Sequence, residues 1–162
     1  MTREEQQIKL DRMRYTKNTL SSGMVLLAIV FNALYFVSLY KSDVGSYYYN
    51  WTIGASIIYN LVFMLVAFLA SEGVKSRRSG FTGILLFLGA MQFARIFYLP
   101  AKAHAAVVSI SGQEVAVMGD GQYGFMVVCL AVSGVLCLAA AVTSSIQNRK
   151  LAAHLRSMEK SA

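Results

Sequence analysis

Four polar side chains stand inside stretches that are otherwise apolar, and they are the residues here best suited to chemistry. Three are the amides Asn32, Asn60 and Gln92, and the fourth is the cation Arg95. A charge or an unpaired amide inside a membrane span is costly, so such residues mark either helix packing or a functional site. The natural partner of Arg95 is an anion, either a lipid headgroup or an acidic residue of another protein.

The three amides share a depth. Counted from the cytoplasmic ends expected for their spans, each lies ten or eleven residues in. This predicts one polar layer, which either clamps the helices together or lines a path for a solute. Three further residues at compatible depths complete a predicted outward-facing pocket with Gln92 and Arg95, namely Tyr35, Ser56 and Tyr59. In the alternative reading, Arg95 is close enough to the span end at Leu99 to extend its charge to the outer headgroups.

The residues needed for catalysis, metal binding and redox chemistry are missing from the apolar stretches. No Asp, Glu or His lies well inside any of them, which argues against a proton relay or an intramembrane hydrolase. His104 and His154 fall on opposite sides of the expected membrane, so they cannot share a metal. Cys129 and Cys137 are about 12 Å apart along one helix, too far for a disulfide. We therefore expect no enzyme activity, no cofactor and no metal site.

Four apolar stretches must position these side chains, and each is long enough to cross a hydrocarbon core of about 30 Å. They cover residues 21–40, 51–70, 81–99 and 121–146. The pattern predicts an all-α integral membrane protein, a four-transmembrane-helix bundle that forms a single membrane domain over residues 1–162. The connecting segments are a basic helix over 1–20, an outer loop over 41–50, a basic loop over 71–80, an outer loop over 100–120 and a basic tail over 147–162.

The basic residues are concentrated on one side of this arrangement. Twelve of the fifteen Lys and Arg residues fall in segments 1–20, 71–80 and 147–162. Short basic loops resist translocation, so both termini are expected in the cytoplasm, with the bacterial cytoplasmic membrane as the expected location. Such segments attract anionic lipids, which makes membrane lipids an expected partner. The net charge of +7 is explained in this way without nucleic-acid binding.

The loop between the third and fourth spans predicts an extracellular β-hairpin. Two short runs of alternating residues flank Gly112-Gln113, and glycine in first position suits a type II′ turn. The predicted register pairs Ser111 with Glu114. It gives the hairpin an apolar contact face of Val108, Ile110, Val115 and Val117. Since an isolated hairpin is only marginally stable, this face is expected to rest on the first outer loop, the membrane or another protein.

Small residues recur every four positions along the fourth span. They are Cys129, Ser133, Cys137, Ala141 and Ser145. A ridge of small side chains lets another helix approach closely. That helix belongs either to the same bundle, to another protein or to a second copy of this chain.

In size and span count the chain is similar to the four-helix disulfide oxidoreductases and the small multidrug transporters. It lacks the paired cysteines of the first and the membrane glutamate of the second. The leading hypothesis is a non-catalytic accessory or assembly subunit of a larger membrane complex such as a transporter, which docks through the fourth span and the outer hairpin. One alternative is a homo-oligomeric channel or small-solute carrier with a path along Asn32, Asn60, Gln92 and Arg95. The other is a lipid- or ligand-sensing membrane module.

Overall fold

The structure is a computed structural model that describes residues 2–8, 17–40, 51–110 and 113–161, without the side chains of 51–53, 108, 110, 113, 158, 160 and 161. Its main elements are the helices α2 (Thr19–Tyr40), α4 (Trp51–Lys75), α5 (Gly80–Ala105) and α6 (Asp120–Ser161), with the strands β1 (Val107–Ile110) and β2 (Gln113–Ala116). All four helices are long and apolar enough to cross a membrane. The predicted mostly helical, membrane-embedded bundle is therefore confirmed.

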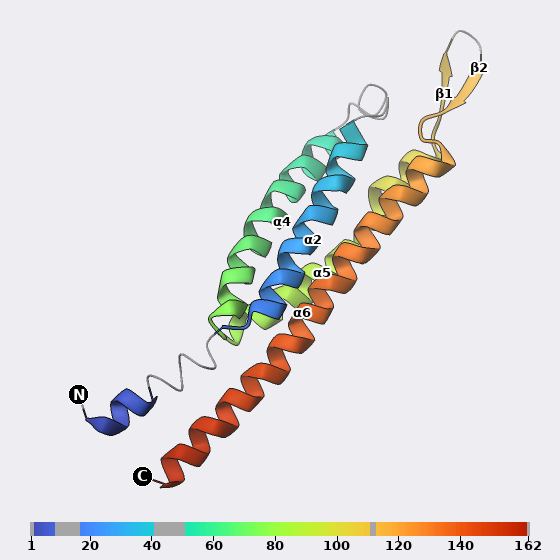
Figure 1. The fold of residues 1–162 in the computed structure, drawn as a ribbon. Helices are drawn as coiled ribbons and strands as arrows, with labels where there is room; N and C mark the ends of the chain where they lie inside the picture. Colours follow the sequence, from blue (N-terminus) through green and yellow to red (C-terminus); the bar gives the residue numbers. More distant parts are fainter. Residues whose placement is uncertain (1, 9–16, 41–50, 111–112, 162) are drawn as a thin grey trace.

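Helix α2 packs against both α4 and α6, and α5 packs mainly against α6, whereas α4 and α5 contact each other less. Residues 3–8 and the C-terminal part of α6 lie at one end of the bundle, and the strands lie at the other (Figure 1). Two clusters of buried apolar side chains fill the interior. The termini-side cluster includes Val25, Phe63, Leu85 and Leu88. The strand-side cluster includes Tyr35, Leu99, Met118, Met126 and Leu130.

The helices continue past the predicted ends of the spans. The second span, predicted to end at residue 70, continues to Lys75, and the third, predicted to end at 99, continues through Pro100 to Ala105. The fourth, predicted over 121–146, continues to Ser161. Apolar content marks where hydrocarbon surrounds a helix, but Lys, Gln and Ala are good helix formers beyond it. At about 1.5 Å per residue, α6 is roughly 63 Å long, twice the thickness of a hydrocarbon core.

The predicted continuous helix over residues 1–20 is wrong. Residues 3–8 are helical, and Thr2 and Glu5 form the reciprocal hydrogen bonds of a capping box, at 3.0 and 3.4 Å. Lys17 and Asn18 are not helical, and residues 9–16 lie outside the described residues. Asn18 instead starts a new helix, because its side-chain oxygen accepts a hydrogen bond from the backbone of Ser21 at 3.2 Å.

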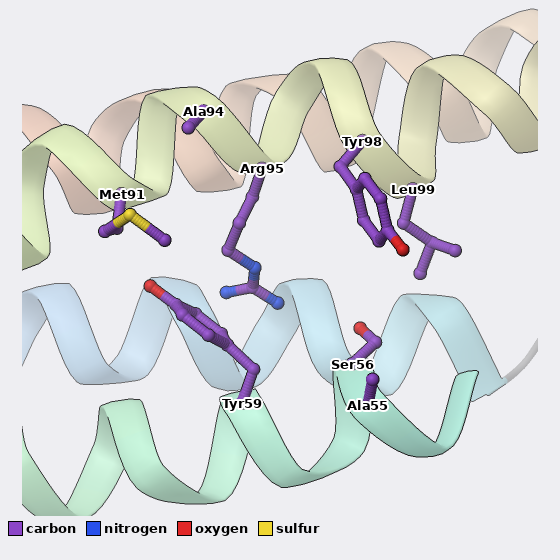
Figure 2. A pocket seen from close by; sticks show the side chains of 8 residues that line it. All are labelled: Ala55, Ser56, Tyr59, Met91, Ala94, Arg95, Tyr98 and Leu99. Atoms are coloured by element: carbon purple, nitrogen blue, oxygen red, sulfur yellow. The ribbon is translucent and has the colours of Figure 1, made fainter. Parts of the chain in front are cut away.

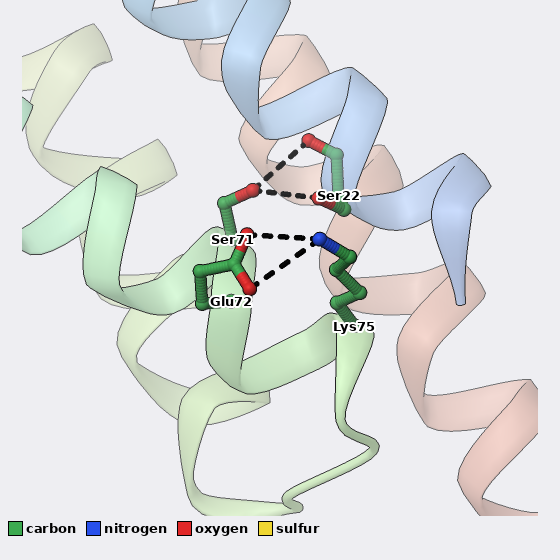
Figure 3. Close-up of polar contacts among 4 residues, drawn as sticks. All are labelled: Ser22, Ser71, Glu72 and Lys75. Carbon is green, nitrogen blue, oxygen red and sulfur yellow. Dashed lines mark hydrogen bonds and ion pairs between the residues drawn. The ribbon is translucent and has the colours of Figure 1, made fainter. Parts of the chain in front are cut away.

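Polar contacts join α2 to α4 at the termini side. The backbone N–H of Asn18 donates to the carbonyl of Lys75 at 3.2 Å. The hydroxyls of Ser22 and Ser71 lie 2.8 Å apart, and the Ser71 hydroxyl also reaches the carbonyl of Ser22 (Figure 3). Both serines are buried, so the hydrogen bond between them satisfies two hydroxyls that would otherwise be costly.

Strands β1 and β2 pair antiparallel, with Ser109 opposite Glu114 and Ile110 opposite Gln113. The predicted register, which placed Ser111 opposite Glu114, is wrong by two residues. The segment that joins the strands is therefore 111–112 rather than Gly112-Gln113. It lies outside the described residues, as does the predicted first outer loop, 41–50.

The predicted apolar contact face does not run along the whole hairpin. Val117 lies beyond the end of β2, where it and Met118 are buried in the strand-side cluster. Burying these two side chains in the bundle removes apolar surface from water, which stabilises this placement. Val115 is 45% exposed, while the side chains of Val108 and Ile110 lie outside the described residues.

Candidate functional site

Arg95 points into the bundle, and its side chain is only 9% exposed. One terminal nitrogen of its guanidinium donates to the side-chain oxygens of Asn32 and Gln92, at 2.9 Å each. The other donates to the side-chain oxygen of Asn60 at 2.8 Å. The alternative in which Arg95 extends to outer headgroups is therefore wrong. Its helix continues ten residues beyond it to Ala105, and its guanidinium contacts three buried amides instead.

Two tyrosines add their ring faces to this site. The guanidinium carbon of Arg95 lies 4.7 Å from the centre of the Tyr35 ring and 4.5 Å from that of Tyr59. Both distances are short enough for a cation–π interaction, which is stronger where water is excluded. Amide oxygens and aromatic faces stabilise a cation, but none of them carries a full negative charge.

A fourth helix joins the site through Ser133 on α6. The side-chain nitrogen of Gln92 donates to Asn32 and to the hydroxyl of Ser133, at 3.0 Å each. That hydroxyl donates in turn to the carbonyl of Ala28 at 2.9 Å. Sequence reasoning assigned Ser133 to the packing ridge and missed its place here. Its depth was the available signal, since it lies thirteen residues from the predicted inner end of its span at Ile146.

A cavity of about 360 Å³ lies beside Arg95, between α4 and α5 (Figure 2). It is lined from α4 by Ala55, Ser56 and Tyr59 and from α5 by Met91, Ala94, Arg95, Tyr98 and Leu99. Ser56, Tyr59 and Arg95 belong to the predicted pocket, whereas Met91, Ala94 and Tyr98 were missed. Met91 and Tyr98 lie four residues before and three after Arg95, so the helical repeat places them on its face, while Ala94 is its neighbour in the sequence.

Among the described residues, no carboxylate neutralises Arg95. Elsewhere in the structure, Glu72 pairs with Lys75, and Asp120 lies 3.7 Å from His104. Removing a cation from water without a counter-charge is expensive, and neutral partners offset only part of the cost. The buried Tyr59 hydroxyl also has no hydrogen-bond partner among the residues that the structure describes. Arg95 is therefore a cation with neutral partners at the edge of the cavity.

The small-residue ridge of α6 packs inside the bundle. Cys129, Ser133, Cys137 and Ala141 are buried, and Ser145 is half-buried. Beside them α5 and α6 approach closely, because a Cβ at Gly134 would lie 3.2 Å from the carbonyl oxygen of Gly89. The four buried residues offer no surface to a second protein. The predicted docking through this ridge is therefore wrong, since α2 and α5 already occupy it.

No protein-family model matches the chain, and neither curated proteins nor solved structures show a significant match. Within the described residues, no three His, Cys, Asp or Glu side chains gather as metal ligands would. Function therefore has to be inferred from the chemistry of the site at Arg95.

Proposed function

We propose that this protein is a non-catalytic membrane module that binds an anionic ligand in the cavity at Arg95. One observation carries the proposal: a buried guanidinium, held only by neutral groups of the described residues, borders an open cavity of about 360 Å³. Cavities of this size are typical of small-molecule sites that combine apolar walls with a few polar groups. A carboxylate or phosphate entering it would supply the missing charge and form charge-assisted hydrogen bonds.

The site is preorganised for such a ligand. Asn32, Asn60 and Gln92 come from three helices and fix the guanidinium from one side, so its position does not depend on the ligand. Tyr59 packs beneath it and carries an unpaired hydroxyl as a further donor. A rigid cation in a water-poor pocket loses little entropy on binding, which favours affinity.

The experiment compares the acidic molecules that copurify with three forms of the full-length protein. Wild type and the control Arg78→Gln, which removes an exposed charge far from the cavity, retain the same acidic species. Arg95→Gln loses it, while Arg95→Lys retains part of it because the charge remains. Mass spectrometry of the gently extracted proteins measures this. Equal amounts of acidic ligand in wild type and Arg95→Gln would contradict the proposal.

One observation favours an accessory subunit as a second candidate. The last fifteen residues of α6, 147–161, continue for about 22 Å past the other helices (Figure 1). This extension is basic and exposes Leu155, so a partner would contact it rather than the buried ridge. A photo-crosslinking residue in place of Leu155 would capture a protein in native membranes, whereas one at lipid-facing Leu86 would not. Equal capture at both positions would remove this candidate.

A solute path along the amides gains no support from this geometry. Asn32, Asn60 and Gln92 are fully buried, and their oxygens accept hydrogen bonds from Arg95. The amides therefore hold the guanidinium of Arg95 in place, and the cavity beside it is the part of the site that a ligand could enter.

A further inference from the structure

The Arg95 cavity adjoins a second, apolar hollow on the surface of α4. This groove, of about 650 Å³, is lined by Gly54, Ala55, Ile58, Tyr59 and Val62. Ala55 and Tyr59 line both spaces, so the groove directly adjoins the cavity. From Gly54 to Val62 the helix rises about 12 Å, which gives the groove the length of a short stretch of hydrocarbon chain.

Access along the bundle axis is blocked on both sides of Arg95. The strand-side cluster, with Leu99 and Met118, fills the interior towards the strands. The termini-side cluster, with Phe63 and Leu88, fills it towards the other end. All of these side chains are at most 6% exposed, so a water-soluble anion meets packed apolar residues from either end of the described bundle.

The open side faces outward between α4 and α5, whose mutual contact is smaller than that of α2 with α4 or of α5 with α6. Ile58 and Val62 on the groove are 63% and 51% exposed, and Tyr98 at the cavity is also exposed. On a helix that crosses a membrane, such apolar side chains face hydrocarbon. Figure 2 shows the guanidinium of Arg95 between α5 and α4.

We propose that the ligand is a single-chain acidic lipid that enters sideways from the bilayer. This inference rests on the proposed function and names its ligand class. The acidic head, a carboxylate or a phosphate, pairs with Arg95, and the hydrocarbon chain lies along Gly54, Ile58 and Val62. Charge complementarity with Arg95 favours the acidic head, and the apolar groove that adjoins the cavity favours the hydrocarbon chain. One groove accommodates one chain, which is why we assign a single-chain lipid.

Gly54 provides a test that leaves Arg95 untouched. A Cβ built at Gly54 meets nothing within 4 Å, so Gly54→Leu fills the groove without clashing in the bundle. Gly83 on α5 is equally open and lies outside both hollows, so Gly83→Leu is the matched control.

The experiment measures saturable binding of radiolabelled palmitate to the full-length protein in phosphatidylcholine nanodiscs. Wild type and Gly83→Leu bind it, whereas Gly54→Leu and Arg95→Gln bind at least about tenfold more weakly. Unlabelled butyrate and inorganic phosphate compete at least about a hundredfold less well than palmitate, because they lack the chain. If Arg95→Gln fails to fold, Ala94→Leu replaces it, since it fills the cavity and leaves the contacts of Arg95 in place.

The outcomes separate the two proposals. Equal binding by Gly54→Leu and Gly83→Leu, or equal competition by inorganic phosphate, would overturn the lipid inference. Anion binding at Arg95 would still stand if Arg95→Gln remained weaker than wild type. Wild-type binding by both Arg95→Gln and Ala94→Leu would overturn the lipid inference together with the proposed function.

Discussion

At the scale of single residues, the partners of Arg95 among the described residues are all neutral. Three amide oxygens lie within 2.9 Å of its terminal nitrogens, and two tyrosine rings lie within 5 Å. The side-chain oxygens of Gln92 and Asn60 accept hydrogen bonds from Arg95, so removing the cation leaves two buried acceptors unsatisfied. The same arrangement leaves the positive charge for an external anion to neutralise.

Asn60→Leu is expected to destabilise the protein by about 1–3 kcal/mol, the cost of a buried donor that loses its partner. The variant removes the acceptor for one terminal nitrogen of Arg95 and the hydrogen bond that Asn60 donates to the carbonyl of Ser56. Thermal unfolding in detergent measures the change. Asn148→Leu is the control, because the side-chain oxygen of Asn148 has no partner among the described residues. Equal melting temperatures for the two variants would contradict a structural role for Asn60.

At the scale of elements, the sequence predicted the residues of the site better than it predicted where the helices end. The shared depth of Asn32, Asn60 and Gln92 could be predicted because a basic segment marks the cytoplasmic end of each span, and depth can be counted from that end. Helix ends were not readable from hydropathy, since backbone hydrogen bonds continue into polar sequence beyond the hydrocarbon. The hairpin register was also predicted wrongly, because both registers keep the same alternation of apolar and polar side chains. The burial of Val117 and Met118 in the bundle distinguishes them.

The crossing of α5 and α6 gives a prediction for Gly134. In Gly134→Ala the added Cβ would lie 2.8 Å from the ring of Phe93 and 3.2 Å from the carbonyl oxygen of Gly89. The helices must then move apart, which we expect to cost about 1–3 kcal/mol. Gly124→Ala on the same helix meets nothing within 4 Å and is expected to be neutral or slightly stabilising. Comparing the two in detergent unfolding checks this, and an unaffected Gly134→Ala would contradict the close crossing.

At the scale of the whole molecule, the two ends of the bundle differ in their number of basic residues. Lys75, Arg77 and Arg78 lie at the end that carries the termini, while Lys102 lies towards the strands. We propose that the termini are cytoplasmic, in the bacterial cytoplasmic membrane, because translocation of short basic segments is disfavoured. The sequence did not specify which helix packs against the small-residue ridge on α6. Small residues specify a close helix contact without specifying the partner, and the partner is the bundle itself.

Single cysteines report the orientation, because the two native cysteines are buried. Ser109→Cys on β1 and Ser79→Cys beside α5 both replace exposed residues. A membrane-impermeant maleimide is expected to label Ser109→Cys in intact cells and Ser79→Cys only after permeabilisation. The reverse pattern would contradict cytoplasmic termini.

The most direct measurement of ligand binding at Arg95 is the ¹⁵N NMR signal of its guanidinium in detergent micelles, assigned by its loss in Arg95→Lys. On titration with palmitate, the Arg95 resonance is expected to shift in a saturable way. The resonance of exposed Arg78 is expected to remain in place. An Arg95 signal that does not move, or that moves only as much as that of Arg78, would contradict a ligand site at Arg95.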